Sequence, residues 1–133
     1  MSSVTNTPQG NNNFSIRLDY DDQRDPGAVH FIVLVNSATI DAATVNPAQQ
    51  PQPPVPNGPI VGWANKDTVN NGTSDGEATF GEGCTAPGCP AWHNLNNGPN
   101  DVSFTIIPDP TGSPAVFSYE LRDAKGKVIL QIP

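Results

Sequence analysis

The chain has 133 residues, the usual size of one domain, and six Lys and Arg against 13 Asp and Glu give it a net charge of −7. It contains no basic cluster, so we expect neither nucleic acid nor an anionic membrane surface as a partner. Only 14% of the residues are charged, and turn-forming Gly, Pro, Asn, Ser and Thr are abundant. This composition predicts short strands joined by many turns.

The first 45 residues predict an arm followed by strands. Residues 1–13 are polar and lack periodicity, so we expect an extended N-terminal arm. The sequence FSIRLDY at 14–20 alternates apolar and polar residues, which predicts a half-buried strand. The run AVHFIVLV at 28–35 predicts a central strand, and it is far shorter than the roughly 20 residues of a membrane span. We expect another strand at 37–45.

Residues 46–101 form a loop-rich insertion. They hold both tryptophans, both cysteines, nine of the 15 prolines and eight of the 12 glycines. The proline tract at 46–59 predicts a surface crossover, and 60–64 and 77–80 predict short strands. A connection this long within a compact domain is usually functional or disordered, and tryptophan is rare in disordered segments. The insertion is therefore the first place to seek a binding site.

The carboxyl third carries the clearest strand patterns, at 102–107, 115–122 and 127–132. The last two predict a hairpin around the sequence DAKG, with apolar residues paired on its inner face. The predicted pairs are Leu121 with Val128, Tyr119 with Leu130, and Phe117 with Ile132, while Val116 and Ile129 point outward.

About eight short strands and no amphipathic helix indicate an all-β fold. We expect a two-sheet antiparallel sandwich of immunoglobulin-like or jelly-roll type with long loops. Residues 14–133 would form this single domain, with the insertion at 46–101 and the arm at 1–13 preceding it.

Two tryptophans are each followed by amides and carboxylates, in GWANKD at 62–67 and AWHNLNNGPND at 91–101. Aromatic rings stack on the C–H faces of sugars, and amides and carboxylates bond sugar hydroxyls, so this pattern favours saccharide binding. The alternative is that both rings are buried under the loops. The predicted ligand-binding residues are Trp92, His93, Asn94 and Asn97, with Trp63, Asn65 and Asp67 as a second patch.

Carboxylates crowd the end of the first predicted strand, in the sequence DYDDQRD. Oxygen ligands of this kind suit calcium, which takes six to eight of them, and the alternative is a solvated acidic turn. We expect no other cofactor. The predicted calcium ligands are Asp19, Asp21, Asp22 and Asp25.

Cys84 and Cys89 flank a Pro-Gly turn, and this spacing allows a disulfide. Together with His93 the two cysteines could also ligate zinc, but the sequence supplies no obvious fourth ligand.

The segment 72–76, GTSDG, matches the G-x-S-x-G pattern of a nucleophile elbow. That motif requires a hydrophobic strand before it and a helix after it, and the flanking sequences TVNN and EATF supply neither. We therefore expect a polar surface turn there and no enzymatic activity.

The sequence thus predicts a non-catalytic binding module that recognises a glycan or protein surface. The alternative is a structural assembly subunit, such as a virion decoration, fibre or surface-layer component, forming homo-oligomers or a lattice through its N-terminal arm and sheet edges. The first residues contain neither the basic nor the apolar region of a signal peptide. We favour an extracellular, virion or cell-surface location over the cytoplasm.

Overall fold

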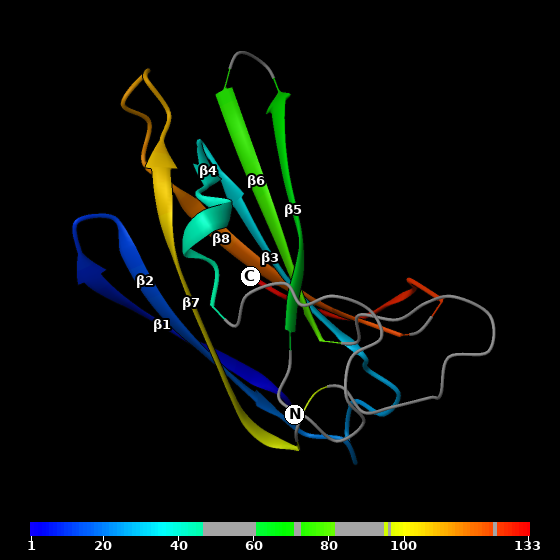
Figure 1. The fold of residues 1–133 in the computed structure, drawn as a ribbon. Coiled ribbons are helices and arrows are strands. Elements are labelled where there is room, and N and C mark those ends of the chain that lie inside the picture. The colour runs from blue at the N-terminus through cyan, green and yellow to red at the C-terminus, as the bar shows by residue number, and fades with distance from the viewer. Residues whose placement is uncertain (47–60, 71–72, 82–94, 96, 124) are drawn as a thin grey trace.

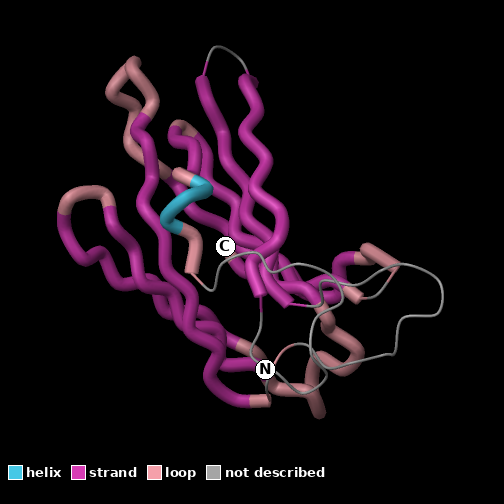
Figure 2. The backbone as a smooth tube through the Cα atoms, in the orientation of Figure 1, coloured by secondary structure: helices cyan, strands magenta, loops and turns pink. Residues whose placement is uncertain are grey.

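The structure, a computed structural model, describes residues 1–46, 61–70, 73–81, 95, 97–123 and 125–133. They form nine strands in two antiparallel sheets, one ordered β1-β2-β7-β4 and the other β5-β6-β3-β8-β9 (Figures 1 and 2). The predicted all-β sandwich is confirmed. The elements are β1 (Ser3–Gly10), β2 (Asn13–Tyr20), β3 (His30–Asn36), β4 (Ala38–Ile40), η1 (Ala42–Thr44), β5 (Val61–Asn70), β6 (Thr73–Gly81), β7 (Gly98–Pro108), β8 (Val116–Arg122) and β9 (Val128–Ile132).

Inward-facing side chains of both sheets build one core. On β2, Ile16 and Leu18 are fully buried because alternate residues of a strand point to the same face. On the other sheet, β3 supplies Phe31 and Val33, also fully buried, and it lies between β6 and β8 as the apolar run predicts. Aromatic rings span the two sheets: the centroids of Phe14 and Phe117 are 4.9 Å apart.

The N-terminal residues correct the expected arm, because Ser3–Gly10 pair with β2 as an edge strand of the four-stranded sheet. The connecting turn has Asn11 at φ 52° and Asn12 at φ 63°. Positive φ at both central residues is the requirement of a type I′ hairpin turn, and asparagine tolerates it. The arm is thus extended as expected, but it belongs to the sandwich.

The segment expected as one strand at 37–45 divides into β4 and the short 3-10 helix η1. Asp41 causes the break: its Oδ1 accepts a hydrogen bond from the backbone N–H of Ala43 at 3.1 Å and caps the helix. In the part of the chain that the structure describes, no helix is long and apolar enough to cross a membrane.

β4 closes one side of the sandwich by lying directly on β6. A Cβ atom built on Gly76 would lie 3.0 Å from the backbone nitrogen of Ile40 and 3.1 Å from the Cα atom of Thr39. A side chain at position 76 would therefore push the two sheets apart, and glycine permits the close approach. Residues 73–76 of the GTSDG segment lie in strand β6, which corrects the expected surface turn.

Asp75, in the same segment, has a structural role. Its Oδ1 accepts a hydrogen bond from the backbone N–H of Ser37 at 3.0 Å. Ser37 has a φ of 65°, a left-handed conformation that is uncommon for residues other than glycine. The carboxylate thus stabilises the tight connection between β3 and β4.

The C-terminal hairpin forms as predicted, but in a different register. Tyr119 pairs with Ile132 and Leu121 with Leu130, two residues away from the predicted partners, and a bulge follows at Arg122. The Asp123 carboxylate causes the longer turn by accepting the backbone N–H groups of Lys125 and Lys127, each at 2.9 Å. Val116 is 58% exposed, as expected, whereas Ile129 is partly buried against the core and does not point freely outward.

Candidate functional site

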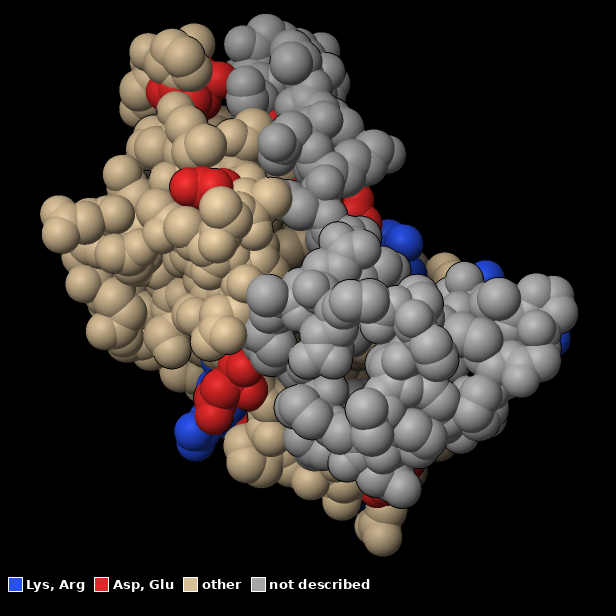
Figure 3. Space-filling model, in the orientation of Figure 1, with Lys and Arg blue, Asp and Glu red and all other residues tan. Residues whose placement is uncertain are grey.

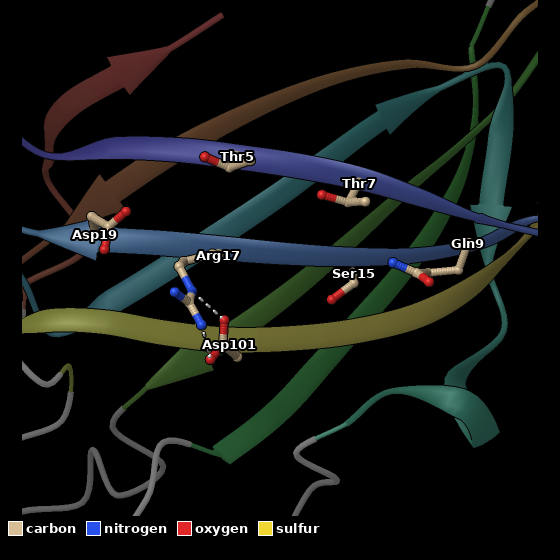
Figure 4. A pocket seen from close by; sticks show the side chains of 7 residues that line it. All are labelled: Thr5, Thr7, Gln9, Ser15, Arg17, Asp19 and Asp101. Carbon is tan, nitrogen blue, oxygen red and sulfur yellow. Dashed lines mark hydrogen bonds and ion pairs between the residues drawn. The ribbon is translucent and has the colours of Figure 1, made fainter.

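The outer face of the four-stranded sheet carries a polar hollow of about 450 Å³. Because Ile16 and Leu18 face the core, the alternate residues of β2 face outward, and the register places residues of β1 and β7 beside them. Arg17 thus lies between Thr5 and Asp101. This outer hollow is lined by Thr5, Thr7, Gln9, Ser15, Arg17, Asp19 and Asp101 (Figure 4).

A two-pronged ion pair crosses the outer hollow from β2 to β7. Arg17 Nε donates to Asp101 Oδ1 at 2.8 Å, and Nη2 donates to Oδ2 at 3.1 Å (Figure 4). These hydrogen bonds raise the pKa of Arg17 and lower the pKa of Asp101. The nearby charge of Asp19 raises the pKa of Arg17 further. Both groups are therefore ionised at neutral pH, and two charge-assisted hydrogen bonds join the side chains.

The neutral groups of the outer hollow are available to a ligand. The hydroxyls of Thr5, Thr7 and Ser15 and the amide of Gln9 form no hydrogen bond to another described residue. A hydroxyl both donates and accepts, and a carboxylamide does the same through separate atoms. The outer hollow thus offers donors and acceptors on a regular sheet, next to two carboxylates and one guanidinium.

The acidic turn predicted to bind calcium contacts the N-terminal residues. Asp21 Oδ2 lies 3.0 Å from the N-terminal ammonium of Met1, and this hydrogen bond and that from the N–H of Arg24 lower the pKa of Asp21. Asp25 Oδ2 accepts the N–H of Ser2 at 2.8 Å, and Ser2 is only 6% exposed.

The four predicted calcium ligands are not gathered at one point. Asp19 lines the outer hollow on β2, whereas Asp21, Asp22 and Asp25 follow in the turn after β2. Among the described residues, no group of three or more His, Cys, Asp or Glu side chains is arranged to hold a metal ion. The calcium prediction therefore gains no support from these carboxylates, and it stays a prediction.

Only one residue of the first tryptophan patch belongs to the described structure. Asn97 is exposed, and its Oδ1 accepts the backbone N–H of Asp22 at 3.1 Å, which brings it beside the acidic turn. Nearby, Leu95 is 6% exposed and joins the core. The other predicted residues of that segment lie outside the described part of the chain: Trp92, His93, Asn94, Cys84 and Cys89.

The second patch lies on β5, the edge strand beside β6. Asn65 pairs with Ala78 and Asp67 with Gly76 in the backbone register. The register shifts between Gly62 and Ala64, so Trp63 falls at a β-bulge. The side chains of all three predicted residues lie outside the described part of the structure.

The outer hollow was missed in the sequence because residues 1–13 were interpreted as an arm. A signal for it exists: the pair Asn11-Asn12 stands between residues 3–10 and the predicted strand at 14–20. Asparagines with positive φ are typical of two-residue hairpin turns. Interpreting them in this way would have placed the arm beside 14–20 and its polar residues beside Arg17.

The described part of the surface in Figure 3 is mostly uncharged, and its Asp and Glu side chains form small separate groups. Comparisons of the chain with protein-family models, with curated proteins and with solved structures give no match. The function is therefore inferred from the geometry of the described side chains.

Proposed function

We propose that the protein is a non-catalytic binding module that holds a saccharide on the outer face of β1, β2 and β7. The observation that carries the proposal is the outer hollow itself: three adjacent strands present seven polar side chains toward one open space of about 450 Å³. Sugar hydroxyls require paired donors and acceptors, which the hydroxyls, the amide and the carboxylates supply.

The electrostatics of the outer hollow favour binding over catalysis. Glycoside hydrolysis requires a carboxylic acid whose pKa is raised so that it can donate a proton. The hydrogen bonds from Arg17 instead lower the pKa of Asp101 and keep it ionised. Of the other lining residues, only Asp19 carries a carboxyl group, and none is a histidine or cysteine.

The sheet also holds the site rigid before a ligand arrives. β2 is paired on both sides from Asn13 to Asp19, so Ser15, Arg17 and Asp19 project from a fixed backbone. A ligand then orders only side chains, which lowers the entropic cost of binding. The fixed spacing of alternate residues suits a ligand with regularly placed hydroxyls, such as a short oligosaccharide.

A glycan array tests the proposal, with the full chain applied once with calcium and once with a chelator. We expect reproducible hits that the double variant Thr5→Val and Thr7→Val reduces at least tenfold, because valine keeps the shape and removes the hydroxyl. Thr39→Val on β4 is the matched control, since Thr39 lies on the same sheet and outside the outer hollow. Hits that require calcium would support the calcium prediction.

Two outcomes of the array contradict the proposal. A blank array rejects saccharide binding altogether. Hits that survive both Thr→Val changes and disappear in Trp92→Ala move the binding site to the loop segment around Trp92.

A second candidate function is assembly into a larger structure. Strands β1 and β9 are sheet edges without a single charged side chain, and Ile107 and Val116 are more than half exposed. Uncharged edges lack a common protection against pairing with another strand.

Size exclusion with light scattering tests this candidate over a range of concentrations. Assembly through β9 predicts oligomers that Gln131→Lys disrupts, since a lysine on an edge strand discourages pairing. Gln23→Lys makes the same change in an exposed turn and serves as the control. A monomer at every concentration argues against assembly.

A further inference from the structure

One carboxylate of the outer hollow has no counterion. Asp101 accepts two hydrogen bonds from Arg17, at 2.8 Å and 3.1 Å, so its charge is already compensated. The carboxylate of Asp19 lines the same space and takes part in no hydrogen bond or ion pair with another described residue. The charge of Asp19 acts on Arg17, but the guanidinium is directed at Asp101 (Figure 4). The outer hollow thus contains one uncompensated negative charge.

The position of Asp19 on β2 keeps that charge unpaired and within reach of a ligand. The residues beside it in the sheet are Ser3 on β1 and Pro99 on β7, and neither is charged. Arg17 is two residues away on the same face of the strand. Figure 4 shows Asp19 at one end of the outer hollow and Gln9 at the other. Asp19 is exposed, so a ligand that occupies the outer hollow can contact it.

The lining of the outer hollow offers a saccharide polar contacts and no stacking surface. None of the described lining residues is aromatic, and the only methyl groups among them belong to Thr5 and Thr7. The C–H faces of a sugar thus find little apolar area to bury. A hydrogen bond between neutral groups contributes modestly because it replaces bonds to water, whereas one that involves a charged group is about twice as strong. Affinity at this site should therefore depend on a charge-assisted contact.

The charges of the outer hollow decide the sign of that contact. One guanidinium stands against two carboxylates, and the chain as a whole carries a net charge of −7. An acidic sugar would be repelled by Asp19 and Asp101, while Arg17 is already paired. An ammonium group on the ligand would compensate Asp19, and Asp101 offsets the nearby charge of Arg17. The outer hollow therefore favours a cationic ligand over an anionic one.

We propose that the outer hollow selects amino sugars and that Asp19 recognises their ammonium group. This inference rests on the proposed saccharide function and adds the chemical class of the sugar. The Asp19 carboxylate accepts hydrogen bonds from the ammonium, and the neutral groups of Thr5, Thr7, Ser15 and Gln9 bond the sugar hydroxyls.

Calorimetric titration of the full chain with two matched trisaccharides tests the inference. The β-1,4 trimer of glucosamine carries an amine on each unit, and cellotriose has a hydroxyl in each of those positions. At mildly acidic pH, where the amines are protonated, and with a chelator present, we expect the glucosamine trimer to bind about fivefold more tightly. The preference is modest because exposed ion pairs contribute little. Added salt should reduce it, since salt screens exposed charges.

Asp19→Asn removes the charge and keeps the size of the side chain. We expect the variant to bind the glucosamine trimer only as tightly as cellotriose, and its affinity for cellotriose to change less than about twofold. Asp22→Asn is the matched control, because it makes the same change in an exposed residue of the following turn, outside the outer hollow. This control should keep the preference for the glucosamine trimer. Circular dichroism checks that both variants fold.

The outcomes separate this inference from the proposed function. Equal affinity for the two trisaccharides, or equal loss in Asp19→Asn and Asp22→Asn, overturns the role of Asp19 and leaves saccharide binding intact. Binding of neither trisaccharide overturns it as well, and the proposed function falls with it only if the glycan array is also blank. Spermidine is cationic and has no hydroxyl, so it should bind more weakly than the glucosamine trimer. Equally tight binding of spermidine would show that the outer hollow attracts any polyamine, and would overturn the selection of amino sugars.

Discussion

The two sides of the sandwich are closed in different ways. On one side β4 lies on β6, and the missing side chain of Gly76 lets backbone meet backbone. On the other side β1 faces β8 through the hydrogen bond from Asn6 to Tyr119, and the rings of Phe14 and Phe117 hold the sheets apart. Packed sheets usually lie about 10 Å apart, a distance that side chains of ordinary size fill. Residue size at a few inward positions thus decides where the sandwich closes and where it leaves a cavity.

The largest predicted effect comes from opening the closed side. Gly76→Val places three carbon atoms where Ile40 and Thr39 already lie in contact, so β4 must move away from β6. We expect the free energy of unfolding to fall by about 2 to 3 kcal/mol, the usual cost of overpacking a core. Urea denaturation followed by circular dichroism measures this change. An unchanged midpoint would mean that β4 does not lie against Gly76 in solution.

The next effect concerns the hydrogen bond across the open side. Tyr119→Phe removes the hydroxyl to which Asn6 Nδ2 donates and leaves the amide with no partner among the described residues. We expect the free energy of unfolding to fall by about 1 to 2 kcal/mol, because the partly buried amide loses its hydrogen-bond partner. Burial raises the pKa of Tyr119, so its hydroxyl stays protonated well above neutral pH.

The double variant Asn6→Leu with Tyr119→Phe is the control for this measurement. It removes both partners together and should recover part of the loss, since two apolar groups leave nothing unsatisfied. If the double variant loses as much as the two single changes added together, the two side chains are not coupled.

A smaller effect of opposite sign is expected beside Phe14 and Phe117, where a hollow of about 510 Å³ opens between the two sheets. Ala115→Val adds two methyl groups to a partly buried residue at its wall, where there is space for them. We expect the free energy of unfolding to rise by about 0.5 to 1 kcal/mol, as cavity-filling changes commonly do. Side-by-side urea curves for Ala115→Val and Gly76→Val then test the comparison directly. Equal destabilisation of both would mean that the two sides are packed alike.

The strands that the sequence predicted correctly have apolar residues on at least one face. Phe14, Ile16 and Leu18 alternate with polar residues, and the structure buries this face against the other sheet. The predicted hairpin register is wrong for a physical reason: side-chain direction repeats every two residues, so a shift by two leaves the same residues facing inward. The Asp123 carboxylate sets the observed register by ordering a longer turn.

The candidate sites were less predictable than the fold. The outer hollow exists only because β1 pairs with β2, and a polar edge strand has little apolar alternation to reveal it. The closeness of Gly76 to β4 joins positions more than 30 residues apart and has no local signal. The most visible pattern in the sequence is tryptophan followed by amides. Of the predicted binding residues in the patch with Trp92, only Asn97 belongs to the described part of the chain.

The smallest predicted effect concerns the outer face, where packing has little influence. Arg17→Gln keeps a hydrogen-bond donor and removes the charge beside Asp101, so the pKa of Asp101 should rise toward its ordinary value. A carboxyl whose pKa is lowered by folding contributes stability above its unfolded pKa and loses it as the pH falls through the folded value. Wild type and variant should therefore differ slightly at neutral pH and converge in strong acid. The difference stays small because the two side chains are 53% and 60% exposed. NMR titration of the Asp101 carboxyl carbon measures the shift, and the same midpoint in both proteins would show that the ion pair does not persist in solution.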